Sequence, residues 1–549
     1  MKRQWKDMTK RLAGGLLALC LLAACRGKDT TTEQSMSESG APSEAKVADS
    51  TANADATEKG IVVYAGKTIF EKSLDPVKGG MSYGYSFTNA ALLKVAPDSS
   101  YVGDMATEWN ISEDAKIYTF TLREGVQFSD GSEMTAEDVA FTYETVRANQ
   151  AENEAIDLTR LESVETPDAK TVVFTLKEPY SPFLDVCAQL GIVPKATYDK
   201  ERFDQFPIGT GPWQVVQYDP NQQIIVEPNP HYYEGVAKLP RVTFVAMDYD
   251  AALSAARSGD LDVVMVNPAV AKEEVPGMTM VPFETMDVRQ ISLPVGEEST
   301  ENGIPVGNNV TSDPAVRKAL NIGIHREQII QNAFNGIGKP AMSFTDNLVW
   351  ARTLPVEDQR VDEAIKLLED AGWKMGADGI REKDGLRCSF ELYAADDRYA
   401  LAAALSEDAK ALGIEIVPHS SGWDEIGKHM NTQSILWGWG QFSPTVLTSL
   451  FDSSSIGTGG FDNPSGYRNP AVDAKIAEAL SASSQEEAIQ SWKQVQELAD
   501  EDVAYLYLVN IQHCYFIDEA LDLSMATQIP HPHGHGAPII CNMKDWAWK

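Results

Sequence analysis

The chain has 549 residues, of which 43% are hydrophobic and 23% are charged, so it can bury a large core and form more than one lobe. Its formal net charge is −34 at pH 7, which argues against nucleic-acid binding, because that function needs a basic face to neutralise phosphates. The excess of acid favours solubility and weakly favours cationic ligands, although such acidity most often serves only solvation.

The N-terminus has the parts of a bacterial lipoprotein signal. A start rich in Lys and Arg precedes an apolar stretch over 12–24, which is shorter than the ~20 residues of a membrane-spanning helix. The stretch ends in LAAC at 22–25, which resembles the lipobox, where cleavage leaves Cys25 as a lipidated N-terminus. We predict a signal peptide over 1–25, with an uncleaved hydrophobic anchor as the alternative. Residues 26–59 are polar and lack aromatics, which predicts a disordered tether.

The segment 107–146 predicts a strand, a turn and a capped helix. Tyr118, Phe120 and Leu122 alternate with polar residues, as in a strand with one buried face. A turn is predicted at 130–131, where Gly follows Asp. Thr135 stands three residues before an acid, which predicts a capping box at the start of a helix. The segment presents no catalytic base, nucleophile or metal-ligand set.

The run AKIYTFTLREGVQFSDGSEMTAEDV at 115–139 resembles the signature region of the family 5 solute-binding proteins. These are the extracytoplasmic receptors of ABC importers for peptides, nickel and opines. Further likeness follows in PIGTGPW at 207–213, in the helical pair over 311–333 and in the amphipathic helix over 362–373. The resemblance covers about 60–549. It implies an α/β, two-lobed fold of the periplasmic-binding-protein type (type II, large cluster C type with an extra subdomain), with the ligand cleft between the lobes.

Three local patterns carry structural expectations. Gly209 and Gly211 predict a tight turn or a close approach of another segment, and the Pro that follows excludes a Walker loop. Asp313 is expected to cap the helix that begins at Pro314. His325 replaces the family's usual Asp, and we expect this change to alter a helix cap rather than a binding site. A helix is also expected to end at Gly259.

The resemblance also implies the order of the domains. Lobe I is expected over 60–290, with an inserted subdomain at about 90–206. The first crossing between lobes is expected near 286–293, and lobe II over 291–522. A second crossing at 522–530 would return the chain to lobe I at its C-terminus, over 523–549.

The candidate ligand-binding residues lie in three stretches. Tyr83 and Tyr85 fall in a region that faces the cleft in the family, although a surface loop with two aromatic anchors is equally consistent. Trp437 and Trp439 alternate with glycines, so a strand would point both indoles to one side, toward the cleft or the core. Gln441 and Phe442 occupy the interval where, in some relatives, an acid pairs with the peptide's amino group. No carboxylate is present at 435–447, so the amino group is captured from elsewhere or the ligand is not an ordinary free peptide.

Histidines gather near the C-terminus. His531, His533 and His535 alternate with Pro and Gly, which excludes a helix and lets imidazoles project to one side. They predict contact with a nickel-type metal or its chelate, and His531 and His533 also count as ligand-binding candidates. The alternative is a tail whose histidines pack at the return crossing. His513 lies in a strand-like run and is expected in the core. The cysteines outside the signal show no CxxC spacing, and their pairing stays open: Cys187, Cys388, Cys514 and Cys541.

The resemblance implies an extracytoplasmic lipoprotein, periplasmic or at the cell surface, that serves an ABC importer of the peptide or nickel type. It would act as a monomer, capture a peptide or a metal chelate by hinge closure, and deliver it to permease subunits driven by a separate ATPase. It would need no cofactor and catalyse no reaction, and bound Ni²⁺ would be cargo. Two alternatives stay open: a metal-dependent hydrolase that uses the C-terminal histidines, and a surface sensor or adhesin without a transporter.

Overall fold

The computed structural model describes residues 59–66, 68–70, 73–80, 86–153, 155–301, 303–344, 348–458, 462–532 and 538–549. The predicted signal peptide and most of the tether lie outside these ranges. Five of the residues singled out above also lie outside them: Cys25, Tyr83, Tyr85, His533 and His535. None of the helices in the described part combines the length and hydrophobicity that crossing a bilayer requires.

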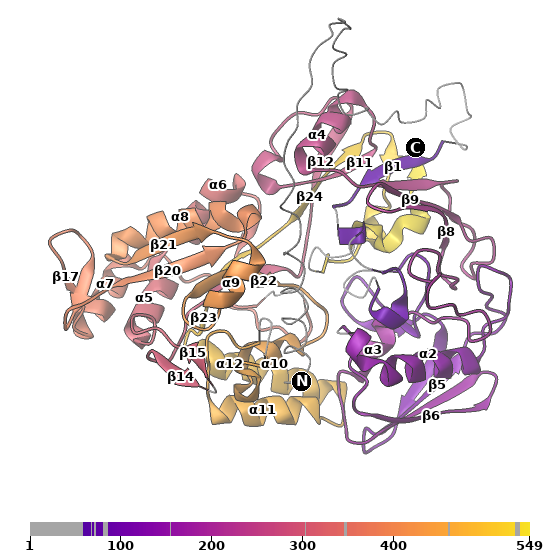
Figure 1. The fold of residues 1–549 in the computed structure, drawn as a ribbon, viewed down its shortest axis with the longest axis horizontal. Helices are drawn as coiled ribbons and strands as arrows, with labels where there is room; N and C mark the ends of the chain where they lie inside the picture. The colour runs from indigo at the N-terminus through magenta and orange to yellow at the C-terminus, as the bar shows by residue number, and fades with distance from the viewer. Residues whose placement is uncertain are drawn as a thin grey trace, which may run out of the picture. The chain divides into compact units, whose positions relative to one another are not determined.

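Seven strands form the first sheet, in the order β12-β24-β11-β1-β10-β9-β8 (Figure 1). Strand β1 is central and runs parallel to both β10 and β11, with Val63 opposite Phe244 and Val263. The strands are β1 (Ile61–Tyr64), β8 (Trp213–Asp219), β9 (Gln223–Pro228), β10 (Val242–Val245), β11 (Val263–Val266), β12 (Met278–Phe283) and β24 (His513–Asp518). Both faces are covered, because Val263 and Tyr515 belong to one buried cluster and their neighbours Val264 and Phe516 to another.

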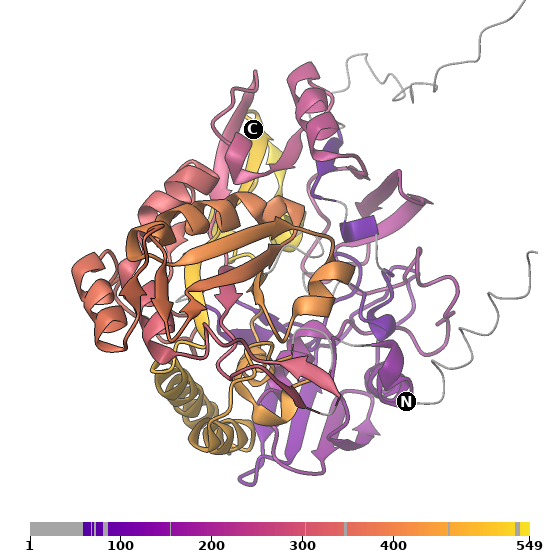
Figure 2. The ribbon, with the colours of Figure 1, turned by 60° about the vertical axis from the view of Figure 1, so that its left-hand side comes forward.

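Six strands form the second sheet, in the order β16-β23-β13-β22-β20-β21. They are β13 (Val288–Ser292), β16 (Lys339–Pro340), β20 (Ser389–Ala394), β21 (Glu415–Ser420), β22 (Ser434–Trp439) and β23 (Tyr505–Asn510). Leu506 and Leu508 pack with helices α5 to α8 on one face, whereas Tyr505 and Tyr507 pack with α9 to α12 on the other (Figures 1 and 2). The inner strands β13, β22 and β23 are buried at nearly every position, whereas buried and partly buried positions alternate along β20.

A smaller, antiparallel sheet has the order β4-β5-β7-β6. Its strands are β4 (Ala106–Ile111), β5 (Ile117–Leu122), β6 (Leu161–Asp168) and β7 (Thr171–Leu176), and helices α2 (Ala136–Ala148) and α3 (Phe183–Gln189) share its buried cluster. Tyr118, Phe120 and Leu122 are buried, as the alternation predicted. The predicted capping box is confirmed, since the Asp138 carboxylate accepts hydrogen bonds from the Thr135 backbone N–H at 2.8 Å and from its hydroxyl at 3.0 Å.

The other helices are α4 (Tyr249–Ser258), α5 (Pro314–Gly323), α6 (Arg326–Phe334), α7 (Val361–Asp370), α8 (Tyr399–Ala409), α9 (Trp423–His429), α10 (Val446–Phe451), α11 (Pro470–Leu480) and α12 (Gln485–Asp500). Short 3₁₀ helices are η1 (Thr68–Phe70), η2 (Pro76–Lys78), η3 (Gln150–Glu152), η4 (Pro268–Val270), η5 (Asp396–Arg398), η6 (Lys410–Leu412), η7 (Ser453–Ser455), η8 (Met525–Thr527) and η9 (Pro538–Asp545). Short strands are β2 (Leu93–Val95), β3 (Tyr101–Gly103), β14 (Ser299–Glu301), β15 (Ile304–Val306), β17 (Lys374–Met375), β18 (Arg381–Lys383), β19 (Leu386–Arg387), β25 (Leu521–Asp522) and β26 (Ala547–Trp548).

The helix signals read from the sequence hold. Asp313 caps α5 by accepting from the Ala315 N–H at 2.9 Å. Helix α4 ends at Gly259, which adopts a φ of 79°. His325 precedes α6 without capping it through its side chain; instead the Asp408 carboxylate accepts from the His325 N–H at 2.8 Å. The Asp358 carboxylate accepts from the next backbone N–H at 2.9 Å, so acids from elsewhere satisfy the helix start.

The chain passes between the two large sheets at 284–287, between β12 and β13, and again at 511–512, between β23 and β24. The second passage precedes the stretch 522–530, where the return was expected. The passages and the segment at 531 are hydrogen-bonded to one another, which fixes how they lie. These bonds are Thr285 hydroxyl to Ile511 carbonyl (2.5 Å), Ile511 N–H to Asp287 carbonyl (2.9 Å), Met286 N–H to His531 carbonyl (2.9 Å) and His531 N–H to Glu284 carbonyl (2.8 Å).

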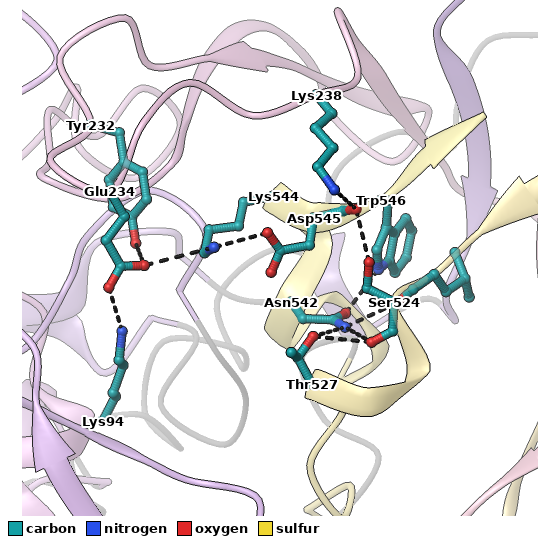
Figure 3. A network of polar contacts seen from close by, with 11 residues as sticks. Lys94, Tyr232, Glu234, Lys238, Ser524, Thr527, Asn542, Lys544, Asp545 and Trp546 are labelled. Atoms are coloured by element: carbon teal, nitrogen blue, oxygen red, sulfur yellow. Dashed lines mark hydrogen bonds and ion pairs between the residues drawn. The ribbon is translucent and has the colours of Figure 1, made fainter. Parts of the chain in front are cut away.

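The C-terminal segment packs on the first sheet and is held by a polar network (Figure 3). The Asn542 amide donates to the carbonyls of Leu523 and Ser524 and to the Thr527 hydroxyl, each at 2.9 Å. The buried Trp546 indole donates to the Asn542 side-chain oxygen at 2.8 Å. Lys544 also lies 3.7 Å from Glu234, so this segment contacts the loop that follows β9.

Gly209 is expected to be essential for packing. A Cβ at this position would lie 2.1 Å from the Thr88 carbonyl oxygen, which is backbone and cannot rotate away. We predict that Gly209→Ala lowers the free energy of unfolding by about 1–3 kcal/mol. Gly296→Ala is the control, because nothing lies within 4 Å of its added Cβ. Denaturant unfolding measures both, and equal stabilities of the two variants would contradict the prediction.

Candidate functional site

A cavity of about 390 Å³ lies between two groups of residues. One group belongs to the buried cluster of the small sheet, and the other begins at the end of strand β22 in the second sheet. Its first wall comes from the segments 95–101, 155–160 and 180–189, and its second wall from 439–449 and Leu480. Pro532 completes the lining. The cavity therefore brings together segments that are far apart in the sequence.

Three of the predicted ligand residues line this cavity: Trp439, Gln441 and Phe442. Strand β22 ends at Trp439, and the loop after it is held by the Trp350 indole, which donates to the Phe442 carbonyl at 2.7 Å. The buried indole N–H of Trp439 donates to no described residue, so it is a donor without a partner at the cavity wall. Trp437 does not line the cavity. It is 2% exposed and packs edge-on against Tyr505 with ring centres 5.7 Å apart.

Asp185 is the residue at the cavity that the sequence reasoning missed. One carboxylate oxygen accepts from the Tyr101 hydroxyl, and the other accepts from the Ser443 hydroxyl at 2.9 Å. Burial raises the pKa of the Asp185 carboxyl to about 7, against the opposing effect of the Ser443 hydrogen bond. The available signal was its position in the apolar run PFLDVCAQL, where a charged side chain needs a reason to be buried.

The other charged groups of the first wall are already paired. Arg160 lies 2.9 Å from Glu178 and 3.5 Å from Asp157, and its guanidinium stacks on the Tyr180 ring at 4.6 Å. The cavity wall thus offers aromatic surface, a fixed cation and acids within one small volume. Such a lining suits a solute that carries both apolar parts and charges.

Two arginines influence each other near the second sheet: the buried Arg289 of β13, the strand next to β22, and the partly buried Arg398 of η5. Arg289 pairs with Asp287, and a Cβ at Gly438 would lie 2.1 Å from its guanidinium, so the glycine makes room for it. Burial lowers the pKa of Arg398 to about 10, and Arg289 acts in the same direction. The Arg398 guanidinium stands 5.1 Å above the Trp423 ring, and its Nε lies 3.8 Å from the Asp397 carboxylate. Each of the two cations therefore has an acid of the protein beside it.

His531 is fully buried at the passage between the sheets and does not line the cavity. Its ring stacks on Phe283 with centres 4.9 Å apart, and its Nδ1 lies 3.3 Å from Nδ1 of His513. Burial, together with His513, holds the pKa of His531 well below its usual range, so the ring is neutral at pH 7. Among the residues that the structure describes, no three His, Cys, Asp or Glu side chains stand as a metal-ligand set. His533 and His535 lie outside that part of the chain.

The four cysteines of the folded body are free thiols. Cys187, Cys388 and Cys514 are buried, and Cys541 is partly buried. Burial raises the pKa of each thiol, to about 12 for the last three. Such thiols are poor metal ligands and poor nucleophiles.

Comparison with known proteins assigns the family. The model of the bacterial extracellular solute-binding proteins, family 5, matches residues 100–459. The chain is 32% identical over 445 residues to protein XP55 of Streptomyces lividans, covering 76% of this chain and 77% of that protein. It is 28% identical over 416 residues to the oligopeptide-binding protein AppA of Bacillus subtilis, covering 71% of this chain and 75% of AppA.

The fold is similar to that of NikZ from Campylobacter jejuni, solved in complex with Ni(L-His). The TM-score is 0.73 at 22% identity, covering 90% of this chain and 100% of NikZ. This likeness supports the α/β, two-lobed fold predicted from the sequence. The match over 100–459 and the identity to XP55 extend beyond fold alone. The chain therefore belongs to the family 5 bacterial extracellular solute-binding proteins of ABC transporters.

Proposed function

We propose that this protein is the lipid-anchored, extracytoplasmic receptor of an ABC importer, which captures a peptide or a metal chelate and delivers it to a permease. The observation that carries this proposal is the cavity between the small sheet's cluster and the segment after β22, with Trp439, Gln441 and Phe442 on one wall. Anchoring would come from a lipid on Cys25 and localisation from the signal before it.

Capture by hinge closure is supported by the contacts across the cavity. The two walls meet through few polar contacts, such as the Ser443–Asp185 bond at 2.9 Å and the bond from the Ser181 hydroxyl to the Ala479 carbonyl at 2.8 Å. Contacts of this kind exchange readily with water, so the walls can separate at modest cost. The passages at 284–287 and 511–512 would then act as the hinge.

The lining supports a solute with mixed character. Trp439, Phe442 and Tyr180 supply aromatic surface, whereas Asp185 and Arg160 supply charge. A peptide, with its charged ends and variable side chains, satisfies both kinds of surface. A metal chelate remains the second candidate, because His533 and His535 follow directly after the cavity residue Pro532 in the sequence. We infer that capture involves no chemical step.

Removing the Trp439 ring tests the assignment of the cavity. We expect Trp439→Ala to weaken binding of the preferred peptide about tenfold or more, because truncating a buried aromatic contact costs about 1–2 kcal/mol or more. Trp548→Ala is the matched control, since Trp548 packs on Lys59 and does not line the cavity. The midpoint of thermal unfolding of the full chain, measured with di- to hexapeptides, gives both affinities by mass action. An unchanged affinity in Trp439→Ala would remove the cavity from the proposal.

The chelate candidate has its own test. Ni²⁺ with free histidine should raise the unfolding midpoint of the full chain, and a double replacement of His533 and His535 by Ala should abolish the increase. His419→Ala is the control, because His419 lies on β21 and is absent from the cavity lining. If the double variant responds to nickel with histidine as the original does, the tail histidines do not hold the chelate; if neither protein responds, the chelate candidate is excluded.

A further inference from the structure

Asp185 places a carboxylate next to the interval 435–447, which has none of its own. The interval 435–447 holds no carboxylate, yet Ser443 of that interval receives one from the opposite wall, because its hydroxyl donates to Asp185 at 2.9 Å. Asp185 is carried by α3, which belongs to the small sheet's cluster. A carboxylate is therefore present at this end of the cavity, although it comes from a distant part of the chain.

We propose that Asp185 binds a primary ammonium group of the solute, such as the free amino terminus of a peptide. The proposal rests on the function proposed above and names the chemical group that the cavity selects. On binding, the ammonium becomes the counter-ion of the carboxylate, and those Asp185 carboxyls that carry a proton release it to solvent. No covalent bond forms or breaks apart from this O–H bond.

The surroundings of Asp185 leave the carboxylate without a cation. Its hydrogen-bond partners are the neutral hydroxyls of Tyr101 and Ser443, and no Lys, Arg or His of the described residues forms an ion pair with it. A carboxylate can accept about four hydrogen bonds, and two are made here. The residue is 5% exposed and lines the cavity, so its remaining acceptor positions are available to a bound group.

The other titratable groups nearby do not take the place of that cation. Arg160 lines the same wall but is paired with Glu178 and Asp157. Tyr180 lies under Arg160, and the buried Cys187 thiol belongs to the residue two positions after Asp185 in α3. Burial without a cation is what raises the pKa of Asp185 to about 7. An ammonium ion in contact would lower it again, so affinity should increase as the pH rises through 7.

Calorimetry of the full chain with tri- to pentapeptides, each in free and N-acetylated form, tests the binding of the ammonium group by Asp185. We expect the free peptides to bind at least about tenfold more tightly, and to release roughly half a proton at pH 7, measured by comparing phosphate and Tris buffers. Asp185→Asn should abolish both the preference and the proton release. Asp500→Asn is the control, because Asp500 is likewise buried, with a pKa raised to about 7, but pairs with Arg352 and is absent from this cavity.

The outcomes separate this proposal from the function on which it rests. Equal binding of free and acetylated peptides, or a preference that survives in Asp185→Asn, overturns the role of Asp185 in ammonium binding. Neither result contradicts the proposed receptor function. Binding of Ni²⁺ with free histidine but of no peptide has the same meaning. If no peptide and no chelate binds, both the receptor function and the ammonium binding by Asp185 are contradicted.

A ligand-free measurement tests the same carboxyl. Because the pKa of Asp185 in the folded protein lies above that of an unfolded Asp, about 3.9, the folded state holds the proton more tightly. This contribution to stability is present at low pH and is lost as the pH rises from about 4 to 7. The unfolding midpoint of Asp185→Asn should therefore increase relative to that of the original protein between pH 5 and pH 8. Parallel pH profiles would overturn the proposal.

Ser443→Ala keeps the test decisive if Asp185→Asn fails to fold. This variant retains the acid but removes the hydrogen bond that lowers its pKa. We expect more proton release at pH 7 and a preserved preference for free amino termini. Unchanged proton release, or loss of the preference with the acid still present, would overturn the role of Asp185.

Discussion

The arrangement of this protein depends on three stretches of backbone that lie side by side where the chain runs between its two large sheets. The segments at 284–287, 511–512 and 531 exchange backbone hydrogen bonds, so each one holds the others. Charged and aromatic groups surround them, including the Arg289–Asp287 pair and the stacked rings of Phe283 and His531. Because each large sheet is packed against a buried cluster on both faces, these few connections are the places where one sheet can move against the other without exposing a core.

Much of the fold was readable from local patterns. The strand over 117–122, the capping box at Thr135, the Asp313 cap and the helix end at Gly259 all depend on neighbours within a few residues, which a sequence displays directly. The long motif at 115–139 added the family and, through it, the two-lobed architecture. The predicted boundaries of the lobes remain a prediction, and the passage at 511–512 lies ahead of the expected return.

The site was harder to predict because its residues meet only in three dimensions. Trp437 and Trp439 lie two residues apart on strand β22, yet their surroundings differ. Trp437 packs into the core, whereas Trp439 is the last residue of the strand and lines the cavity. Asp185 and Ser443 are joined by a hydrogen bond across a large separation in sequence, and no periodicity reveals such a pair. The fit of the Arg289 guanidinium beside Gly438 is likewise a contact between distant parts of the sequence, which no local pattern reveals.

The free thiols have a consequence for a protein that is proposed to work outside the cytoplasm. Cys187, Cys388 and Cys514 are each enclosed by apolar side chains, and burial suppresses the thiolate that would react with an oxidant. Once folded, the chain needs no thiol oxidase to reach its working form and no reductant to keep it. Its sensitive period is the time before folding, when the same sulfur atoms are open to mispairing.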